Sequence, residues 1–301
     1  MKILYGTQDI KIDVTGICMT QLLDNDIITI PRGDVNRADY FTDPVIGILK
    51  KVYIDWEDGG PFTEYEDACL ITINTLDNTV NVEYTGLNLI EKRLAEIHST
   101  LRLNYGSFHE EYSEQRLSVK YLTGNEKVLE IGGNIGRNSL VIARILGENP
   151  NFVVLESDTY TSGQLLENRD LNSFPFIIEN SAISKRNLIQ KGWNTIESDV
   201  LLEGYNSVNI ITYDELKAKH GIEFDTLIID CEGSFYYILL DMPEILTNIN
   251  LIIMENDYED ITHKQYIESV LQSNNFELDY SEPGGWGPCF DSFYEVWKKV
   301  V

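Results

Sequence analysis

The chain has 301 residues, 43% of them hydrophobic and 24% charged, a composition typical of a globular protein with a full core. Asp and Glu number 49 against 23 Lys and Arg, so the formal net charge is -26 and the surface repels nucleic-acid phosphates. Nucleic acid is therefore excluded as the expected substrate. The length suits two domains, or one domain with a large extension.

The cysteines and the first residues indicate where the protein acts. The four cysteines are scattered without a Cys-x-x-Cys pair, so neither a disulfide framework nor a zinc site is expected. The opening residues, MKILYGTQDIKIDV, are too polar for a signal peptide, and no apolar run approaches the ~20 residues of a membrane span. We expect a cytoplasmic protein with no membrane partner.

Residues 1–86 are predicted to form a small β-rich domain. Segments rich in β-branched and aromatic residues follow one another, namely KILYG, IDVTGICM, DIITIP, ILKKVYIDW and ACLITINTL with TVNVEY. LDNT at residues 76–79 predicts a hairpin turn, and PRGD, TDP and EDGGP predict loops. We predict an antiparallel sheet and assign this domain no activity.

The pattern changes at residue 87. LNLIEKRLAEIHSTLRL and HEEYSEQRLSVKYL predict two helices, the first with an apolar face made of Leu87, Ile90, Leu94, Ile97 and Leu101. Strands that alternate with helices follow, and they are KVLEIG, FVVLES, PFIIENSAIS, FDTLIIDCEG and LIIMEND. NFELDYSE and SFYEVWKK predict a closing antiparallel pair. Residues 87–301 are therefore predicted to form an α/β domain, a Rossmann-like doubly wound sheet covered on both faces.

The stretch KVLEIGGNIGRNSL joins a buried strand to a helix through a glycine-rich turn. Gly132, Gly133 and Gly136 allow a tight turn that brings backbone N–H groups close to a ligand. A dinucleotide fingerprint requires G-x-G-x-x-G, and Asn134 breaks that pattern. Glu130 instead places a carboxylate at the strand end, which suits a zwitterionic amino acid or a sulfonium cation better than a pyrophosphate.

The next strand ends in VVLESD, and an acid there can accept hydrogen bonds from both hydroxyls of a ribose. We choose Glu156 for this role, with Asp158 second. A ribose and a cationic amino-acid end together describe S-adenosylmethionine (SAM). Structural alternatives stay open at this point: Glu130 can cap a helix or pair with Arg137, and Glu156 can be a solvated strand end.

Several blocks of the sequence resemble FkbM-type SAM-dependent methyltransferases over roughly residues 107–301. In order, they are VLEIGGNIGRNSLVIARIL, VVLESD, LLENRDLN, ENSAIS, DTLIIDCEG and LIIMEND. GSFHEEYSEQ, EIGGNIGRNS and DCEGSFYYIL look most similar to members from giant DNA viruses. The resemblance implies a class I methyltransferase fold and methylation of a sugar hydroxyl, on a glycan or a nucleotide sugar. If the source is viral, it also implies the host cytoplasm.

The resemblance further implies which residues bind the cofactor: Glu130, Gly132, Gly133, Asn134, Gly136, Glu156, Ser157, Ser181, Ala182 and Asp230. Of these, Ser181 and Ala182 would lie by the adenine, while Asp230 and Glu232 would face the transferred methyl group. The family usually carries a lysine two residues before the aspartate that corresponds to Asp230, and Ile228 occupies that position here. Any role of that lysine is not available to this chain.

Methyl transfer to a sugar hydroxyl requires a general base or a divalent metal to manage the proton. The catalytic candidates are Asp230, Glu232, Glu255, Asp257 and His109. We prefer a metal-free base, either Asp230 or Glu255, although Asp230, Glu255 and Asp257 would suit Mg²⁺ if a metal takes part. Structural alternatives are strand-end capping for Glu255 and Asp257, and an exposed helix start for His109.

Two other functions stay open. One is a non-catalytic binding or scaffold protein with a relic cofactor fold, and the other is a methyltransferase that acts on a protein or a lipid. Trp286, on the Gly- and Pro-rich loop of residues 283–288, is a candidate for stacking on a sugar ring. A homo-oligomer is possible.

Overall fold

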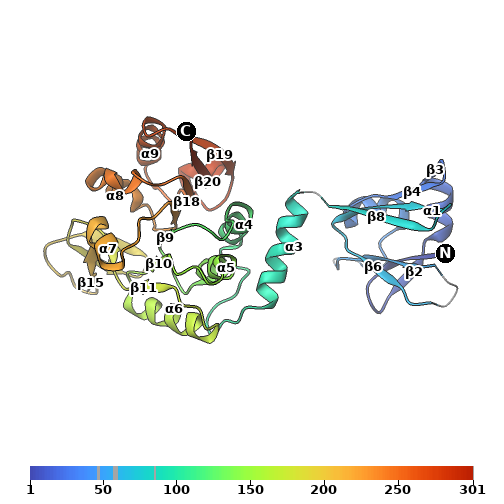
Figure 1. Cartoon of the computed structure of the whole chain (residues 1–301), viewed down its shortest axis with the longest axis horizontal. Coiled ribbons are helices and arrows are strands. Elements are labelled where there is room, and N and C mark those ends of the chain that lie inside the picture. The colour runs from blue at the N-terminus through green and yellow to red at the C-terminus, as the bar shows by residue number, and fades with distance from the viewer. Residues whose placement is uncertain (46–47, 57–59, 85, 301) are drawn as a thin grey trace. The chain divides into compact units, whose positions relative to one another are not determined.

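The computed structural model describes residues 1–45, 48–56, 60–84 and 86–300, with the backbone alone for residues 86–88. The chain divides into two compact units, Met1–Lys92 and Arg93–Val301, which are coloured blue to cyan and green to red in Figure 1. No helix among the described residues is long and apolar enough to cross a membrane.

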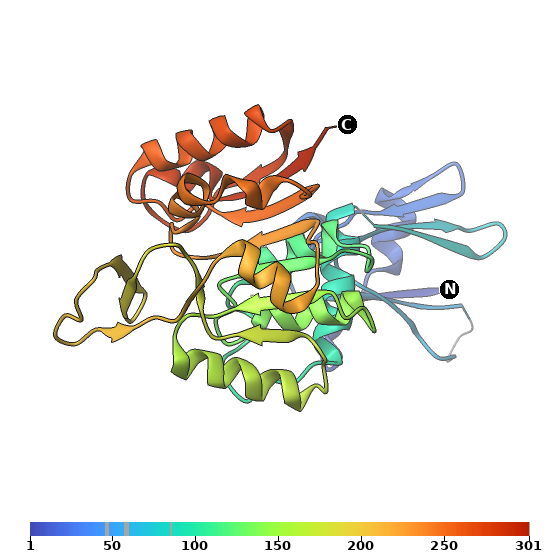
Figure 2. The ribbon, with the colours of Figure 1, turned by 60° about the vertical axis from the view of Figure 1, so that its left-hand side comes forward.

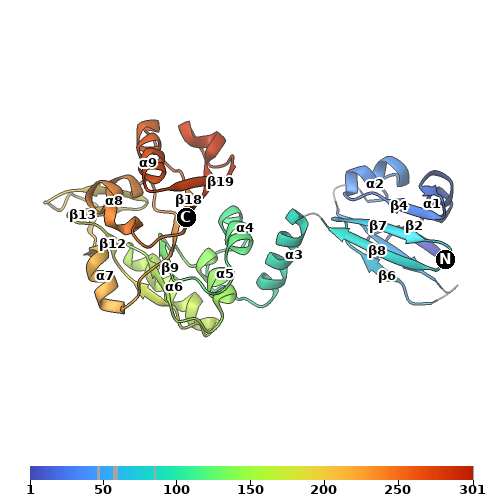
Figure 3. The same ribbon diagram turned by 45° about the horizontal axis from the view of Figure 1, so that its top comes forward.

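The first unit contains, within its described residues, two four-stranded antiparallel sheets. One has the order β2 (Lys11–Asp13), β1 (Lys2–Gly6), β5 (Lys51–Asp55), β6 (Thr63–Tyr65), and the other β3 (Leu23–Asp24), β4 (Ile27–Ile30), β7 (Cys69–Asn74), β8 (Thr79–Tyr84). Helices α1 (Thr15–Gln21) and α2 (Asp34–Phe41) lie on the same side of β7 and β8 in Figure 3. The predicted hairpin between the last two strands is confirmed, since Asn74 pairs with Thr79 across it.

The predicted strand over IDVTGICM is wrong in its second half, where α1 forms. Val14 and Cys18 are both fully buried, and the N–H of Cys18 donates to the carbonyl of Val14 over 2.9 Å. Helical spacing therefore places both side chains on one face toward the core. The β preference of this stretch is weak compared with that packing.

Helix α2 is not predicted by the sequence pattern, because a charged residue occupies its buried face. Arg37 and Phe41 are the buried residues of this helix. The Arg37 guanidinium donates to the backbone carbonyls of Pro31, Glu66 and Cys69, which satisfies the buried charge. A buried arginine does not register as apolar periodicity, so the helix escapes a hydrophobic pattern search.

The second unit is built on a seven-stranded sheet that confirms the predicted Rossmann-like α/β fold. Its order is β11 (Ile177–Glu179), β10 (Phe152–Leu155), β9 (Val128–Ile131), β17 (Thr226–Ile229), β18 (Leu251–Glu255), β20 (Tyr294–Lys299), β19 (Phe276–Glu282). The first five strands in this order are parallel, and β20 runs antiparallel between β18 and β19 as the predicted closing pair. The order reverses between β9 and β17, which is the point where such sheets bind ligands.

Helices cover both faces of this sheet. They are α4 (Tyr112–Tyr121), α5 (Arg137–Leu146), α6 (Thr159–Leu171), α7 (Tyr213–His220), α8 (Phe235–Asp241) and α9 (Ile261–Ser273), with the 3-10 turns η1 (Pro243–Leu246) and η2 (Gly287–Ser292). Helix α3 (Gly86–Ser99) contains the boundary between the two units. Helices α4 and α5 lie on one side of the strands, and α7 and α8 on the other (Figure 1). Leu94, Ile97 and Leu101 are buried, whereas the side chain of Leu87 lies outside the described residues.

The predicted strand PFIIENSAIS divides into two. Its first part is β11, and its second part, β12 (Ala182–Ile183), leaves the main sheet to pair with β16 (Ile210–Ile211). Between β12 and β16 the chain forms a small sheet of β13 (Leu188–Lys191), β14 (Asn194–Glu197) and β15 (Asn206–Ser207). This insertion, coloured olive, extends away from the seven-stranded sheet in Figure 2.

Candidate functional site

A cavity of about 350 Å³ lies at the carboxyl ends of β9, β10, β17 and β18, and we call it the main cavity. Its position at the sheet's switch point is where open α/β sheets bind ligands. Six carboxylates line it, namely Glu111, Glu114, Glu156, Asp230, Glu232 and Glu255. Its described lining contains no Lys, Arg or His. The main cavity is therefore suited to a ligand that carries positive charge.

The glycine turn fixes one wall of this cavity. Gly132 has a φ of +94°, and a Cβ built on it would lie 1.5 Å from the carbonyl oxygen of Asp230. Its N–H and that of Gly133 both donate to the carbonyl of Leu155, over 3.0 and 2.9 Å. Gly136 also has a φ of +94°. Gly132 is required because β9 and β17 approach closely at their ends, and Gly136 is required because a Cβ there would lie 2.4 Å from Leu165 Cδ1 in α6. Gly133 and Gly136 do not line the main cavity.

Glu156 connects the glycine turn to the start of α6. It is 7% exposed, and its two carboxylate oxygens accept the backbone N–H groups of Asn134, over 2.9 Å, and Asp158, over 2.8 Å. Burial raises its pKa to about 7. Each carboxylate oxygen has a second lone pair, so Glu156 can still accept hydrogen bonds from a ligand in the main cavity.

A row of small polar residues continues from Glu156 along the cavity wall. The hydroxyl of Ser157 donates to Gln190 Oε1 over 3.0 Å. Ser181 is 6% exposed, and its hydroxyl has no hydrogen-bond partner among the described residues. Ser181 and Ala182 both line the main cavity. A buried hydroxyl without a partner carries a desolvation cost that a bound polar ligand would remove.

Glu130 lies behind the glycine turn and not in the main cavity. It is 2% exposed and accepts hydrogen bonds from Ser139 Oγ over 2.5 Å and Asn138 Nδ2 over 3.3 Å, both in the first turn of α5. Together with Asn138 it lines a side cavity of about 10 Å³, the size of one water. Arg137 does not pair with it, because its guanidinium contacts Glu110 and Glu111.

Burial raises the pKa of Glu130 from 4.5 to about 8. Because the folded chain holds this proton more tightly than the unfolded chain does, proton binding stabilises the fold. This stabilisation is complete below the unfolded pKa and is lost as pH rises through 8. We expect the difference in unfolding free energy, Glu130→Gln minus wild type, to increase by on the order of 4 kcal/mol between pH 5 and pH 9. Urea unfolding across that range measures it.

The control for this experiment is Glu277→Gln, at an exposed position on β19. Its unfolding free energy should follow that of wild type at every pH. Parallel pH profiles for Glu130→Gln and wild type would contradict the assignment of a buried, late-ionising carboxyl group.

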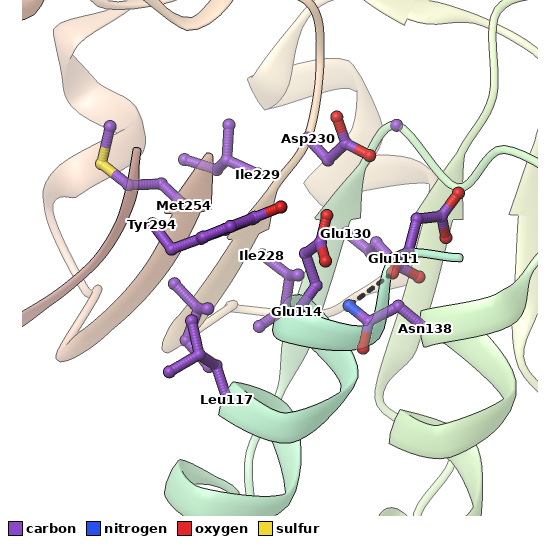
Figure 4. Close-up of a pocket in the computed structure, with 12 residues that line it drawn as sticks. Glu111, Glu114, Leu117, Glu130, Asn138, Ile228, Ile229, Asp230, Met254 and Tyr294 are labelled. Carbon is purple, nitrogen blue, oxygen red and sulfur yellow. Dashed lines mark hydrogen bonds between the residues drawn. The ribbon is translucent and has the colours of Figure 1, made fainter. Parts of the chain in front are cut away.

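Carboxylates from three further elements meet beside Glu130. Glu111, Glu114, Glu130, Asp230 and Tyr294 all line the side cavity, and Figure 4 shows the hydroxyl end of Tyr294 facing Glu114 and Asp230. Burial, with neighbouring carboxylates second, raises the pKa of Glu255 to about 11 and that of Asp230 well above its usual range. Protons or cations must therefore offset this charge.

Glu232 lies where the main cavity joins a larger outer cavity of about 800 Å³, and it lines both. Its φ of +50° places it in the left-handed region, between Cys231 and Gly233. Partial burial and the nearby Asp257 carboxylate raise the pKa of Glu232 to about 8. Such a group holds its proton near neutral pH and can exchange it there.

The remaining sequence candidates lie farther out. Asp257 lines the outer cavity, as does Trp286, which is 56% exposed. His109 is exposed and lines neither the main, the outer nor the side cavity. The structure therefore groups Asp230, Glu232 and Glu255 but leaves His109 apart from them.

Sequence reasoning misses several residues that line the main cavity, among them Glu111, Glu114, Gln190, Trp193 and Tyr294. The three-residue spacing of the two glutamates in HEEYSEQ puts them close together at the start of α4, which was an available signal. Gln190 and Trp193 belong to the insertion, and Tyr294 comes from the last strand described. No local pattern marks these three as neighbours of the glycine turn.

Comparison with known proteins gives likenesses of fold alone. No protein-family model and no curated protein matches the sequence. Among solved structures, a putative O-methyltransferase from Klebsiella pneumoniae is 16% identical, with a TM-score of 0.42 over 72% of this chain and 92% of that one. The O-methyltransferase from Bacillus cereus in complex with SAH is 14% identical (TM-score 0.42, 71% and 90%). The O-methyltransferase TomG from Streptomyces achromogenes, in complex with SAM, is 11% identical (TM-score 0.42, 73% and 92%). These values are too low to carry a function to this chain.

Proposed function

We propose that the second unit is a SAM-dependent O-methyltransferase. The observation that carries this proposal is the main cavity itself, with six carboxylates and no basic residue in its described lining, at the switch point of a Rossmann-like sheet. SAM has a positive sulfonium, a protonated amine and a ribose, and each matches carboxylates. A ligand with a pyrophosphate, such as NAD, would meet repulsion from the same groups.

The cofactor residues follow from the wall of the main cavity. Glu156 would accept the ribose hydroxyls, and the unpartnered Ser181 hydroxyl with Ala182 would lie against the adenine. Gly132 and Asn134 would face the methionine part, with Asp230 at the methyl end. Glu130 would act as a positioning residue through Ser139 and Asn138, because it lies outside the main cavity.

The outer cavity is the proposed acceptor site, and its chemistry supports a sugar. Trp193, Trp286, Tyr237 and His263 line it, and aromatic rings of this kind pack against the apolar faces of sugars. Its one described arginine, Arg186, already pairs with Asp241 and Glu197. With no other Lys or Arg in the described lining to meet a diphosphate, a neutral glycan fits better than a nucleotide sugar.

Proton transfer is assigned to Glu232. A bound SAM would supply a methyl carbon for in-line displacement, with the electron pair of the broken carbon–sulfur bond left on sulfur. In its ionised form, which becomes the major form as pH rises through about 8, Glu232 at the junction of the two cavities would accept the proton of the acceptor hydroxyl while the new carbon–oxygen bond forms. Glu232 replaces Asp230 and Glu255 in this role because it alone of the three also lines the outer cavity.

Replacing Glu232 with Gln is expected to lower kcat by about 100-fold, the usual contribution of a general base, while SAH binding stays unchanged. The assay uses labelled SAM with a panel of neutral glycans, nucleotide sugars, peptides and lipids, and isothermal titration measures SAH affinity.

Glu259→Gln is the matched control, since Glu259 is an exposed acid in the lining of the outer cavity. It should retain activity. Absence of SAH binding to wild type would overturn the proposed function. SAH binding without turnover on any acceptor would favour a non-catalytic binding protein. Turnover on peptides or lipids alone would replace the sugar by a protein or a lipid as the proposed acceptor.

A further inference from the structure

Three carboxylates in the main cavity form a group with the dimensions of a cation site. Glu114 comes from α4, Asp230 follows β17, and Glu255 ends β18. One oxygen of each lies within 4.8 Å of the other two. Oxygen ligands on opposite sides of Mg²⁺ or Ca²⁺ are separated by about 4–5 Å, so the spacing suits either ion.

A second observation points to a ligand at this group. Glu114 is only 7% exposed, and its Oε2 has no hydrogen-bond donor among the described residues, since the Glu255 carboxylate beside it is another acceptor when both are ionised. A buried carboxylate oxygen without a partner is costly unless a proton or a cation satisfies it. Figure 4 shows the Glu114 side chain directed toward Asp230 and the hydroxyl end of Tyr294.

The nearby protein cations are engaged elsewhere. Arg137 contacts Glu110 and Glu111, and Arg116 contacts Glu282. Neither guanidinium lines the main cavity. Neutralisation of the three-carboxylate group must therefore come from bound protons or from a cation that enters the cavity.

We propose that Glu114, Asp230 and Glu255 bind a divalent cation of the Mg²⁺ or Mn²⁺ class. Their ligand set is oxygen alone, without His or Cys, which selects hard cations over zinc or copper. Two positive charges offset three carboxylates better than a single ammonium group does. The site lies beside Glu232, with Cys231 the one residue between it and Asp230.

The role given to the cation in methyl transfer rests on the proposed function, whereas cation binding itself can be measured independently of it. Bound beside Asp230, the cation would hold the acceptor oxygen and make its hydroxyl more acidic, so that Glu232 receives the proton more readily. This departs from the metal-free base that the sequence favours. The sequence suggests Asp230, Glu255 and Asp257 as possible metal ligands. In the structure Glu114, and not Asp257, completes the group with Asp230 and Glu255, and its buried oxygen favours a bound cation.

The test is metal binding to the full chain in the absence of cofactor. Protein freed of metal with EDTA is titrated with Mn²⁺, and the free ion is followed by electron paramagnetic resonance. We expect one ion per chain, and Glu114→Gln should weaken its Kd by about tenfold or more. Glu255→Gln should do the same, and it serves if the first variant fails to fold.

Glu111→Gln is the matched control. Glu111 is a carboxylate of the same cavity, but it accepts hydrogen bonds from Asn134 and Arg137 and lies outside the three-residue group. Its Kd for Mn²⁺ should stay close to that of wild type. A second readout is the Tm in EDTA, which Glu114→Gln should raise because it removes an unneutralised carboxylate.

Absence of Mn²⁺ binding at millimolar concentration, or equal affinity in wild type and Glu114→Gln, would overturn the inference and assign the charge balance to shared protons. SAH titration of the same preparations separates the two proposals. If the protein binds SAH but does not bind Mn²⁺, only the metal site is rejected. If it binds Mn²⁺ but does not bind SAH, only the cofactor proposal is rejected.

Discussion

Replacing Gly132 with Ala is expected to unfold the cavity wall and abolish SAH binding. The added Cβ would lie 1.5 Å from the backbone oxygen of Asp230, and the φ of +94° disfavours any side chain. Relief requires β9 and β17 to separate at their ends. Overpacking costs about 1–3 kcal/mol and a left-handed conformation about 1–2 kcal/mol more, so we expect a loss of about 3 kcal/mol or more in urea unfolding.

Gly163→Ala is the matched control for this substitution. Gly163 lies inside α6, where an added Cβ meets no atom within 4 Å. Alanine there should stabilise the helix by up to about 1 kcal/mol and leave SAH affinity unchanged. If Gly132→Ala matched wild type in both stability and SAH affinity, the close approach of the two strand ends would be refuted.

The second large effect is expected for Glu156→Gln. The amide keeps the size of the side chain but presents one acceptor oxygen in place of two and loses the negative charge. Each hydrogen bond to a charged group contributes about 1.5–3 kcal/mol, so loss of one of the two proposed ribose contacts should weaken SAH binding by about 10- to 100-fold. Isothermal titration calorimetry at constant pH measures the change.

Glu179 provides the comparison, because it is also a buried glutamate at a strand end, on the neighbouring β11. It accepts hydrogen bonds from Lys219 and His220 and does not line the main cavity. Glu179→Gln is expected to lower stability with little change in SAH affinity. Equal affinity losses in both variants would mean that Glu156 acts on the fold and not on the ligand.

The central sheet can be predicted from sequence because its strands carry their own signal. In β9, β10 and β17 every residue is buried, so near-continuous apolar runs mark them, and the glycine turn marks where the first one ends. Glu156 and Asp230 are found for the same reason, as acids directly after such runs. The site prediction is strongest where one strand end carries both the fold signal and the chemistry.

The parts that escape prediction depend on contacts between distant segments. Glu114 and Tyr294 are far apart in the chain, and only the strand order brings β20 beside β18, where Tyr294 pairs with Glu255. Trp193 reaches the cavity on an insertion with no apolar period of its own. Helix α1 forms because Val14 and Cys18 reach a core that local β preference does not describe.

The position of β20 also has a consequence for synthesis. Strand β20 inserts between β18 and β19, although the ribosome makes it after both. Until residues 294–299 emerge, the inner edge of β18 has no neighbour and exposes free backbone groups to other nascent chains. Tyr294 also arrives with this strand, so the lining of the main cavity is completed late in translation, and a stalled or shortened product should be prone to aggregate.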